Sequence, residues 1–191
     1  MGLDIHLITD NSEEISRLKN ANNHLDFFNQ HSLSRTFCNL MSRKDAINEE
    51  TELDQISRLT NTDISVLYEM EQYWSEDEVD FRLSFAENES KKQAVLDQIT
   101  NSRKKIDGNI DRVLITVETL IEKLSHFSNL SEKLNSHGLD TLGYDYYFTD
   151  FNLDKGEGYI GNNFGQDLRN FKKFLEYAKA NGAITVWFNY G

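Results

Sequence analysis

Residues 96–127 read LDQITNSRKKIDGNIDRVLITVETLIEKLSHF, and this stretch decides the expected fold. Its apolar residues advance by alternating steps of three and four, with Arg103 as the only interruption. They are Leu96, Ile99, Ile106, Ile110, Val113, Val117, Leu120, Leu124 and Phe127. Side chains spaced in this way form one stripe along a helix, which another helix or a sheet must cover. The pattern predicts one long helix that begins near residues 88–90 and ends near Ser128.

Two interpretations of this stripe remain open. It belongs either to a helix in the core of one globular domain or to an intermolecular coiled coil. Leu114 and Ile121 widen the stripe beyond a two-position seam, which favours a domain core. Gly108 lies inside the expected helix at a cost of about 1 kcal/mol relative to alanine, so we expect a kink or a close helix crossing there.

The composition indicates a single domain over residues 1–191. A chain of this length can bury one sizeable core, and its many aromatic residues can help to close it. There is no proline, and no glycine- or serine-rich tract has the composition of a linker.

The net charge is −12, from 32 acidic and 20 basic residues. This excess repels phosphate backbones and anionic lipid surfaces, which argues against nucleic acid or a membrane as partner. Much of the excess lies in residues 48–89, where the run SEDEVD occupies residues 75–80. A run of this kind is either a solvated face or a surface that steers a basic partner.

Cys38 is the single cysteine, so it cannot form an internal disulfide. Its apolar surroundings, TFCNLM, indicate a buried and unreactive thiol. The opening MGLDIHLITD lacks the basic and apolar regions of a secretory signal. No window approaches the roughly 18 uninterrupted apolar residues of a membrane span. We therefore expect a cytoplasmic protein.

Helical spacing and capping residues predict most of the remaining chain to be helical. The expected segments are residues 12–30 with a break near Asn20, a helix from Ser34, two short helices within residues 51–73, a helix opened by the capping-box pair Ser75 and Glu78, a turn at residues 131–136, and a helix from Asn162 or Asn163 to residues 181–182.

Strands are expected near both ends. Residues 3–8 alternate apolar and polar side chains, and the aromatic run YDYYFTDF from Tyr144 also predicts a strand. The closing run AITVWFNY, residues 183–190, predicts a strand that pairs with one of these two. The fold class is therefore α+β. A small sheet from the N- and C-terminal segments packs on a mainly helical middle with one long helix.

The segment GEGYIG has the glycine spacing of a dinucleotide-binding loop at Gly156, Gly158 and Gly161. In that motif the first glycine follows a strand directly, and an acidic residue follows about 20 positions later. Here the turn NLDK intervenes, and the strand expected after the next helix ends at Tyr190 without a carboxylate, which favours a glycine-rich hairpin and no bound dinucleotide.

Asp150, Asn152 and Asp154 occupy alternate positions, as in the first half of a calcium-binding loop. The glycine of that motif stands one place late, at Gly156, and its closing glutamate is replaced by Gly161. The three residues are candidate ligands for a divalent cation. The alternative is a hairpin turn in which their side chains cap the backbone.

Asp4 and His6 share one face of the first strand, and His24 can join them if the first helix folds back. These residues are the candidate catalytic or metal-binding site, against the alternative of polar residues at a sheet edge. Asp26 diverges from His24 on a helix, because a step of two residues turns about 200°. His31 lies roughly 10 Å from His24 along the axis. No nucleophile elbow, phosphate loop or paired-cysteine motif occurs.

The opening MGLDIHL and the later segment ANNHLDFF resemble the start of uncharacterised bacterial and phage proteins. Those proteins begin Met-Gly-Leu-Asp and carry a related Asn-x-x-His segment on their first helix. They have a Tyr-Trp pair just before that helix, where this sequence has residues 17–19, Arg-Leu-Lys. The resemblance covers about a fifth of the chain and implies no activity. It directs attention to Asp4, His6, Asn20 and His24.

Two functions remain open. The first is a small acidic interaction protein, such as an immunity or antitoxin-like factor that neutralises a basic protein partner, as a monomer or a homodimer. Tyr144, Tyr146, Tyr147 and Trp187 are residue types that anchor interfaces, unless the long helix covers them. The second is a metal-assisted hydrolase at the N-terminal Asp-His site. The first is favoured because no catalytic motif is present, and no cofactor is expected apart from a divalent cation.

Overall fold

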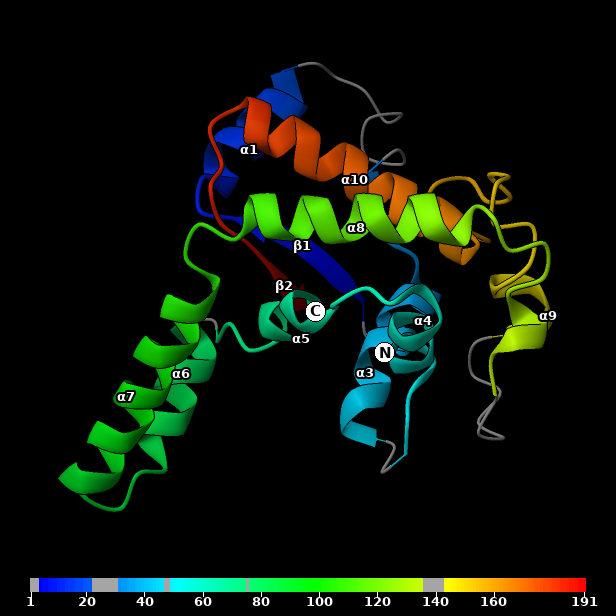
Figure 1. Ribbon diagram of the computed structural model, residues 1–191. Helices are drawn as coiled ribbons and strands as arrows, with labels where there is room; N and C mark the ends of the chain where they lie inside the picture. Colours follow the sequence, from blue (N-terminus) through cyan, green and yellow to red (C-terminus); the bar gives the residue numbers. More distant parts are fainter. Residues whose placement is uncertain (1–3, 22–30, 47–48, 75, 136–142) are drawn as a thin grey trace.

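The computed structural model describes residues 4–21, 31–46, 49–74, 76–135 and 143–191 (Figure 1). In chain order its elements are β1 (Ile5–Thr9), α1 (Ser12–Ala21), α3 (Arg35–Ala46), α4 (Glu52–Thr60), α5 (Ser65–Met70), α6 (Glu76–Ser84), α7 (Glu89–Ile106), α8 (Ile110–Leu124), the 3-10 helix η1 (Ser131–Lys133), α9 (Tyr144–Tyr147), α10 (Phe164–Ala180) and β2 (Val186–Tyr190). Helices dominate and the two strands form one sheet, which confirms the α+β class.

The sheet joins the N- and C-terminal segments. β1 and β2 run antiparallel, with Ile5 opposite Tyr190 and Thr9 opposite Val186. A two-stranded sheet is marginal by itself, so it depends on packing against helices. Ile5, Val186 and Phe188 provide that packing, because each is buried in the main hydrophobic core. The predicted closing strand is confirmed, and its partner is the first strand.

The strand predicted to begin at Tyr144 is wrong, because this segment forms the short helix α9. The carbonyl of Gly143 accepts hydrogen bonds from the backbone N–H groups of Tyr146 and Tyr147, which closes a helical turn. A strand with one covered face would bury every second side chain. Here Tyr147 and its neighbour Phe148 are both buried. Burial of two consecutive rings therefore decides the local structure.

The apolar stripe is divided between α7 and α8, so the predicted continuous helix is wrong, although α7 with its 18 residues is a long helix. The two helices meet at a turn in which Gly108 has a φ of +66°. Glycine adopts this left-handed conformation without the strain that a Cβ atom brings. Asn109, also in this turn, exchanges two hydrogen bonds of 2.9 and 2.8 Å with the backbone of Val186. The turn is thereby tied to β2.

The α8 helix carries the part of the stripe that enters the main hydrophobic core. It packs along α10 (Figure 1), and its fully buried side chains are Val113, Val117, Leu120 and Leu124. Leu114 and Ile121 are partly buried against the same core, as the wide stripe predicts. In α7, by contrast, Leu96 is 42% exposed. The stripe therefore lies in a core over α8, whereas its first part leaves the core.

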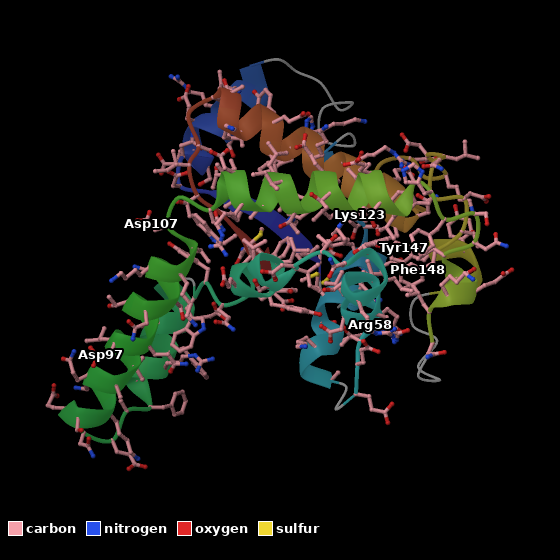
Figure 2. The ribbon with its side chains drawn as sticks, in the orientation of Figure 1. Arg58, Asp97, Asp107, Lys123, Tyr147 and Phe148 are labelled. Carbon is pink, nitrogen blue, oxygen red and sulfur yellow. The ribbon has the colours of Figure 1, made fainter. Side chains whose placement is uncertain are left out.

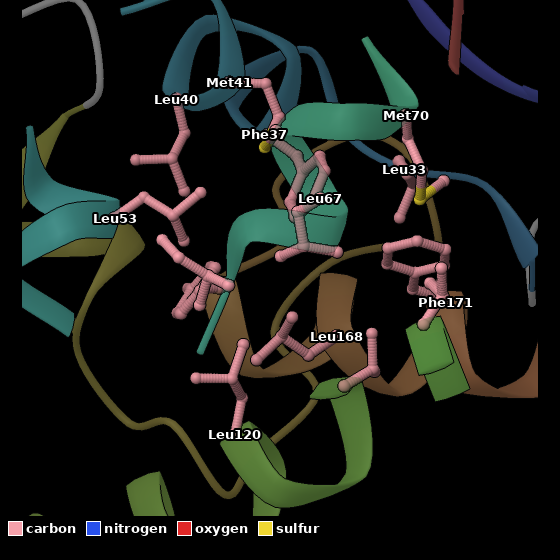
Figure 3. Close-up of a cluster of buried hydrophobic side chains, with 14 of the residues drawn as sticks. Leu33, Phe37, Leu40, Met41, Leu53, Leu67, Met70, Leu120, Leu168 and Phe171 are labelled. Atoms are coloured by element: carbon pink, nitrogen blue, oxygen red, sulfur yellow. The ribbon is translucent and has the colours of Figure 1, made fainter. Parts of the chain in front are cut away.

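One hydrophobic cluster holds the sheet and the helices together. Figure 3 shows part of it, which includes Phe37 and Met41 of α3, Leu53 of α4, Leu67 of α5, Leu120 of α8, and Leu168 and Phe171 of α10. The same cluster includes residues of β1 and β2. None of the helices in the described segments is both long and apolar enough to cross a membrane.

The other helix predictions are confirmed where the structure describes them. The two short helices are α4 and α5. In front of α4, the Thr51 hydroxyl accepts from the Asp54 N–H at 3.1 Å and the Asp54 carboxylate accepts from the Thr51 N–H at 3.2 Å. Asn163 caps α10 through its side-chain oxygen. The predicted cap at Ser75, and residues 22–30 of the predicted first helix, lie outside the described residues.

Candidate functional site

Asp4 and His6 lie at β1, where Asp4 is engaged by protein groups. Its carboxylate accepts hydrogen bonds from the Tyr159 hydroxyl at 2.5 Å and from the Arg35 guanidinium at 3.1 Å. The bond from Tyr159, and then that from Arg35, hold the pKa of Asp4 below its usual value. His6 is exposed, and His24 lies outside the described residues. Asp4 therefore ties the segment before β1 to two distant parts of the chain.

A cavity of about 240 Å³ lies beside β1 and α1. Its polar lining includes His6, Ser12, Ser16, His31 and Tyr159. The His31 ring packs against the rings of Phe174 and Tyr177, at centroid distances of 6.4 and 5.9 Å. Within the described ranges, no three His, Cys, Asp or Glu side chains are placed to hold a metal ion. Because His24 lies outside the described residues, the site of Asp4, His6 and His24 in the hydrolase alternative stays a prediction.

In the candidate cation loop, Asp150, Asn152 and Asp154 each contact a different partner. Asp150 forms an ion pair of 2.7 Å with Lys155, and Asp154 one of 2.6 Å with Arg169. The Asn152 side-chain amide donates to the carbonyl of Ser125 at 3.0 Å. The three candidate ligands therefore contact three different groups. These contacts stabilise the loop between α9 and α10.

The glycines of GEGYIG belong to a turn-rich loop, not to a strand followed directly by a helix. The Gly156 backbone exchanges hydrogen bonds of 2.7 and 2.9 Å with the Gln166 side-chain amide. A Cβ atom at Gly156 would lie 2.3 Å from the backbone nitrogen of Asn162, so only glycine fits. This glycine serves close packing of the loop on the start of α10.

Sequence reasoning misses Asp167, which is fully buried in the first turn of α10. Its carboxylate accepts hydrogen bonds from the Ser34 N–H (3.0 Å), the Ser34 hydroxyl (2.6 Å), the Tyr147 hydroxyl (2.8 Å) and the Asn162 amide (2.8 Å). Burial raises the pKa of Asp167 to about 6, against the effect of these donors. All four donors are internal, so the cluster joins the start of α3 to α9 and α10. An aspartate between apolar positions of an amphipathic helix was the only clue.

The aromatic residues proposed as interface anchors differ in how far they are buried. Tyr147 is 1% exposed, so it is a core residue and that expectation is wrong. Tyr146 is exposed, and its hydroxyl donates to the Gly161 carbonyl at 2.8 Å. Trp187 is partly buried and stacks on Tyr73 with ring centroids 4.1 Å apart. Nothing is described of the Tyr144 side chain.

The helical hairpin formed by α6 and α7, called the arm below, extends away from α8 and α10 (Figure 1). Figure 2 shows Asp97 on the outer half of α7 and Asp107 at its junction with α8. Phe81, on α6, is 65% exposed, and Phe85, in the turn directly after α6, is 69% exposed. Their rings meet edge to face with centroids 4.7 Å apart. The arm therefore presents a pair of phenylalanine rings to solvent. The i,i+4 spacing in FRLSF indicates that the two rings are neighbours, but it does not indicate that they are exposed.

The acidic run SEDEVD lies on the same helix. α6 begins at Glu76, directly within this run, and Glu78 and Asp80 are exposed. On the loop side of the arm, Lys91 and Lys92 pair with Glu87 and Glu89. Exposed carboxylates on α6 thus lie close in sequence to the exposed rings of Phe81 and Phe85.

A comparison of the chain with family models, with curated proteins and with solved structures finds no match.

Proposed function

We propose that the protein is an acidic interaction protein that binds a basic protein partner through the outer face of α6. The observation that carries this proposal is the exposed pair Phe81 and Phe85, in which Phe81 lies on the helix that also bears the acidic run and Phe85 follows that helix directly. Single apolar residues on a surface are common, but neighbouring exposed rings form the kind of patch that marks an interaction site.

The free energy of burying aromatic side chains supports Phe81 and Phe85 as the residues that anchor a partner. Full burial of one phenylalanine side chain stabilises by about 1.5–3 kcal/mol, so covering both rings would contribute a large share of a binding free energy. Inside the arm, Ile99 and Ile106 of α7 are buried, yet neither belongs to the main core. The arm can therefore present Phe81 and Phe85 without removing side chains from that core.

Charge supports the choice of a basic partner. Glu78 and Asp80 are exposed and precede Phe81 on α6, and the whole chain carries a net charge of −12. Complementary charge around an apolar centre raises the association rate and suppresses unsuitable partners, and salt weakens both effects. An immunity or antitoxin-like role, in which the protein neutralises a basic factor, fits this arrangement.

We propose a cytoplasmic location for this interaction. Cys38 is a free, fully buried cysteine, and burial raises the pKa of its thiol to about 11. A thiol of this kind stays protonated and unreactive, as suits a structural residue in a reducing compartment.

The test is a pull-down from cells of the native source, followed by calorimetry with the captured partner. The double variant Phe81→Ser, Phe85→Ser should weaken binding at least tenfold, and rising salt should weaken binding to the unchanged protein. Ile115→Ser is the matched control, because Ile115 is 63% exposed on α8, outside the arm. The affinity of this control variant for the partner should stay within about twofold of that of the unchanged protein.

Two results would contradict the proposal. One is the absence of any specific partner even at low ionic strength. The other is a partner that binds the double variant as tightly as the unchanged protein.

A further inference from the structure

A second cavity, of about 470 Å³, lies at the base of the arm, where α7 approaches β2. Its lining includes Asp10, Tyr73, Arg103, Lys104, Asp107 and Trp187. The volume lies in the range of sites that hold small molecules. The lining residues differ from the residues of the proposed partner surface on α6, so the two sites can be tested separately.

Stacked aromatic rings form one side of this cavity. Tyr73 and Trp187 are 4.1 Å apart at their centroids, with an angle of 21° between the rings. The Arg103 guanidinium lies over the Tyr73 ring, 5.3 Å from its centroid. Trp187 is only partly buried at the cavity. A flat ring that enters the cavity can therefore extend an existing stack.

Two cations that line the cavity have no ion-pair partner among the described residues. Many basic side chains of this acidic protein form ion pairs, such as Arg112 with Glu69 and Lys179 with Asp111. Arg103 and Lys104 are exposed and form no ion pair with any described residue. Such a pair of cations fits a phosphate group, which accepts hydrogen bonds from a guanidinium and an ammonium group.

Two carboxylates border the same space. Asp10 accepts hydrogen bonds of 3.1 Å from the backbone N–H groups of Ile184 and Thr185, which fix its position. Asp107 follows the last turn of α7 and is exposed. Carboxylates are acceptors only, so they suit a ligand that also carries N–H donors. Aromatic rings, cations and acceptors therefore meet in one cavity.

We propose that this cavity binds a nucleoside monophosphate whose base bears an exocyclic amine. The base stacks on Trp187, the phosphate contacts Arg103 and Lys104, and the amine donates to Asp10 or Asp107. The net charge of −12 disfavours a polyanion such as nucleic acid, but one phosphate needs only the two local cations.

The test is calorimetry and NMR with the full chain and named nucleotides. AMP, CMP and GMP should bind more tightly than UMP, which lacks the amine, and at least tenfold more tightly than adenosine or inorganic phosphate. The indole N–H resonance of Trp187 should shift on binding; the variant Trp74→Phe assigns it, since the chain has two tryptophans.

Variants locate the phosphate contact. Arg103→Gln with Lys104→Gln should weaken AMP binding at least tenfold, and Lys105→Gln, a neighbouring exposed lysine outside the lining, should leave it within about twofold. Circular dichroism verifies that each variant is folded. The proposal is overturned if AMP, CMP and GMP all fail to bind at about 5 mM, or if the double variant binds AMP as well as the unchanged protein.

Discussion

At the scale of single residues, Asp167 shows how a buried carboxylate can be structural. Its two oxygens accept hydrogen bonds from four donors, which belong to Ser34, Tyr147 and Asn162. These residues come from three separate parts of the chain. A buried donor left without an acceptor costs the full desolvation penalty, so the cluster is stable only as a unit.

Two substitutions of Asp167 separate the effect of the negative charge from the effect of the side chain's size and hydrogen bonds. In Asp167→Asn the side-chain oxygen can accept from the Ser34 N–H, while the new amide donates to the hydroxyls of Ser34 and Tyr147. The hydroxyl hydrogens of Ser34 and Tyr147 then lose the carboxylate oxygen as acceptor, so we expect this variant to lose about 1–2 kcal/mol of stability at pH 7. Asp167→Ala leaves four buried donors unpaired and should cost about 3 kcal/mol or more. Urea denaturation of both variants measures this difference, and equal losses would contradict the account.

The same carboxyl group makes stability depend on pH. Burial raises the pKa of Asp167 from 3.8 to about 6, so the folded state binds this proton more tightly than the unfolded state. Protonation of Asp167 therefore increases the free energy of unfolding as the pH falls through about 6. This contribution disappears as the pH rises above that value. Between pH 7 and pH 5 the gain should be about 1 kcal/mol.

The control for this prediction is Asp167→Asn, which cannot take up the proton. Subtracting its denaturation curves from those of the unchanged protein removes the contributions of other carboxyl groups, including Asp4, whose lowered pKa acts in the opposite direction. A difference that does not vary between pH 7 and pH 5 would contradict the expectation.

At the scale of elements, the division of the apolar stripe between α7 and α8 gives each helix a different role. α8 packs along α10 in the core, while α7 pairs with α6 in the arm. Gly108 and Asn109 separate the two helices by a left-handed turn and by bonds to β2. The spacing of apolar residues is sufficient to predict the stripe, because the stripe depends only on the geometry of a helix. Where the helix ends depends on a contact with a strand that lies far away in sequence.

The core position of α8 predicts the effect of Val117→Asp. Val117 is fully buried, so the new carboxylate would be buried without a partner and should cost about 4 kcal/mol or more. Circular dichroism and sedimentation should show an unfolded chain. Ile115→Asp, two residues earlier on the exposed side of α8, should cost less than about 1 kcal/mol. A folded, monomeric Val117→Asp protein would mean that the stripe lies between chains.

At the scale of the whole molecule, residues from both ends of the described chain close the core. β2 contributes Val186 and Phe188 to the cluster that α8 and α10 also enter, and β1 contributes Ile5. The turn before α8 is tied to the same strand. Contacts between the two ends are therefore needed before the core is complete.

Removal of residues 186–191 tests this dependence. The shortened chain loses the partner of β1 together with the buried Val186 and Phe188, and we expect it to lose its cooperative thermal transition. A chain without Gly191 alone loses only two backbone hydrogen bonds to Asp4 and should still unfold cooperatively. A cooperative transition in the shorter chain would show that the helices form the core without β2.

Local spacing and capping residues predict the α+β class, the apolar stripe of α8, a cap of α10 at Asn162 or Asn163, and the pair α4 and α5. These follow from helical and strand periodicity and from hydrogen bonds between residues close in sequence. Tertiary structure alone decided the helix at α9, the turn at Gly108, the burial of Tyr147 and Asp167, and the exposure of Phe81 and Phe85. Each of these depends on which distant segment covers a side chain, and the pattern of a single segment does not contain that information.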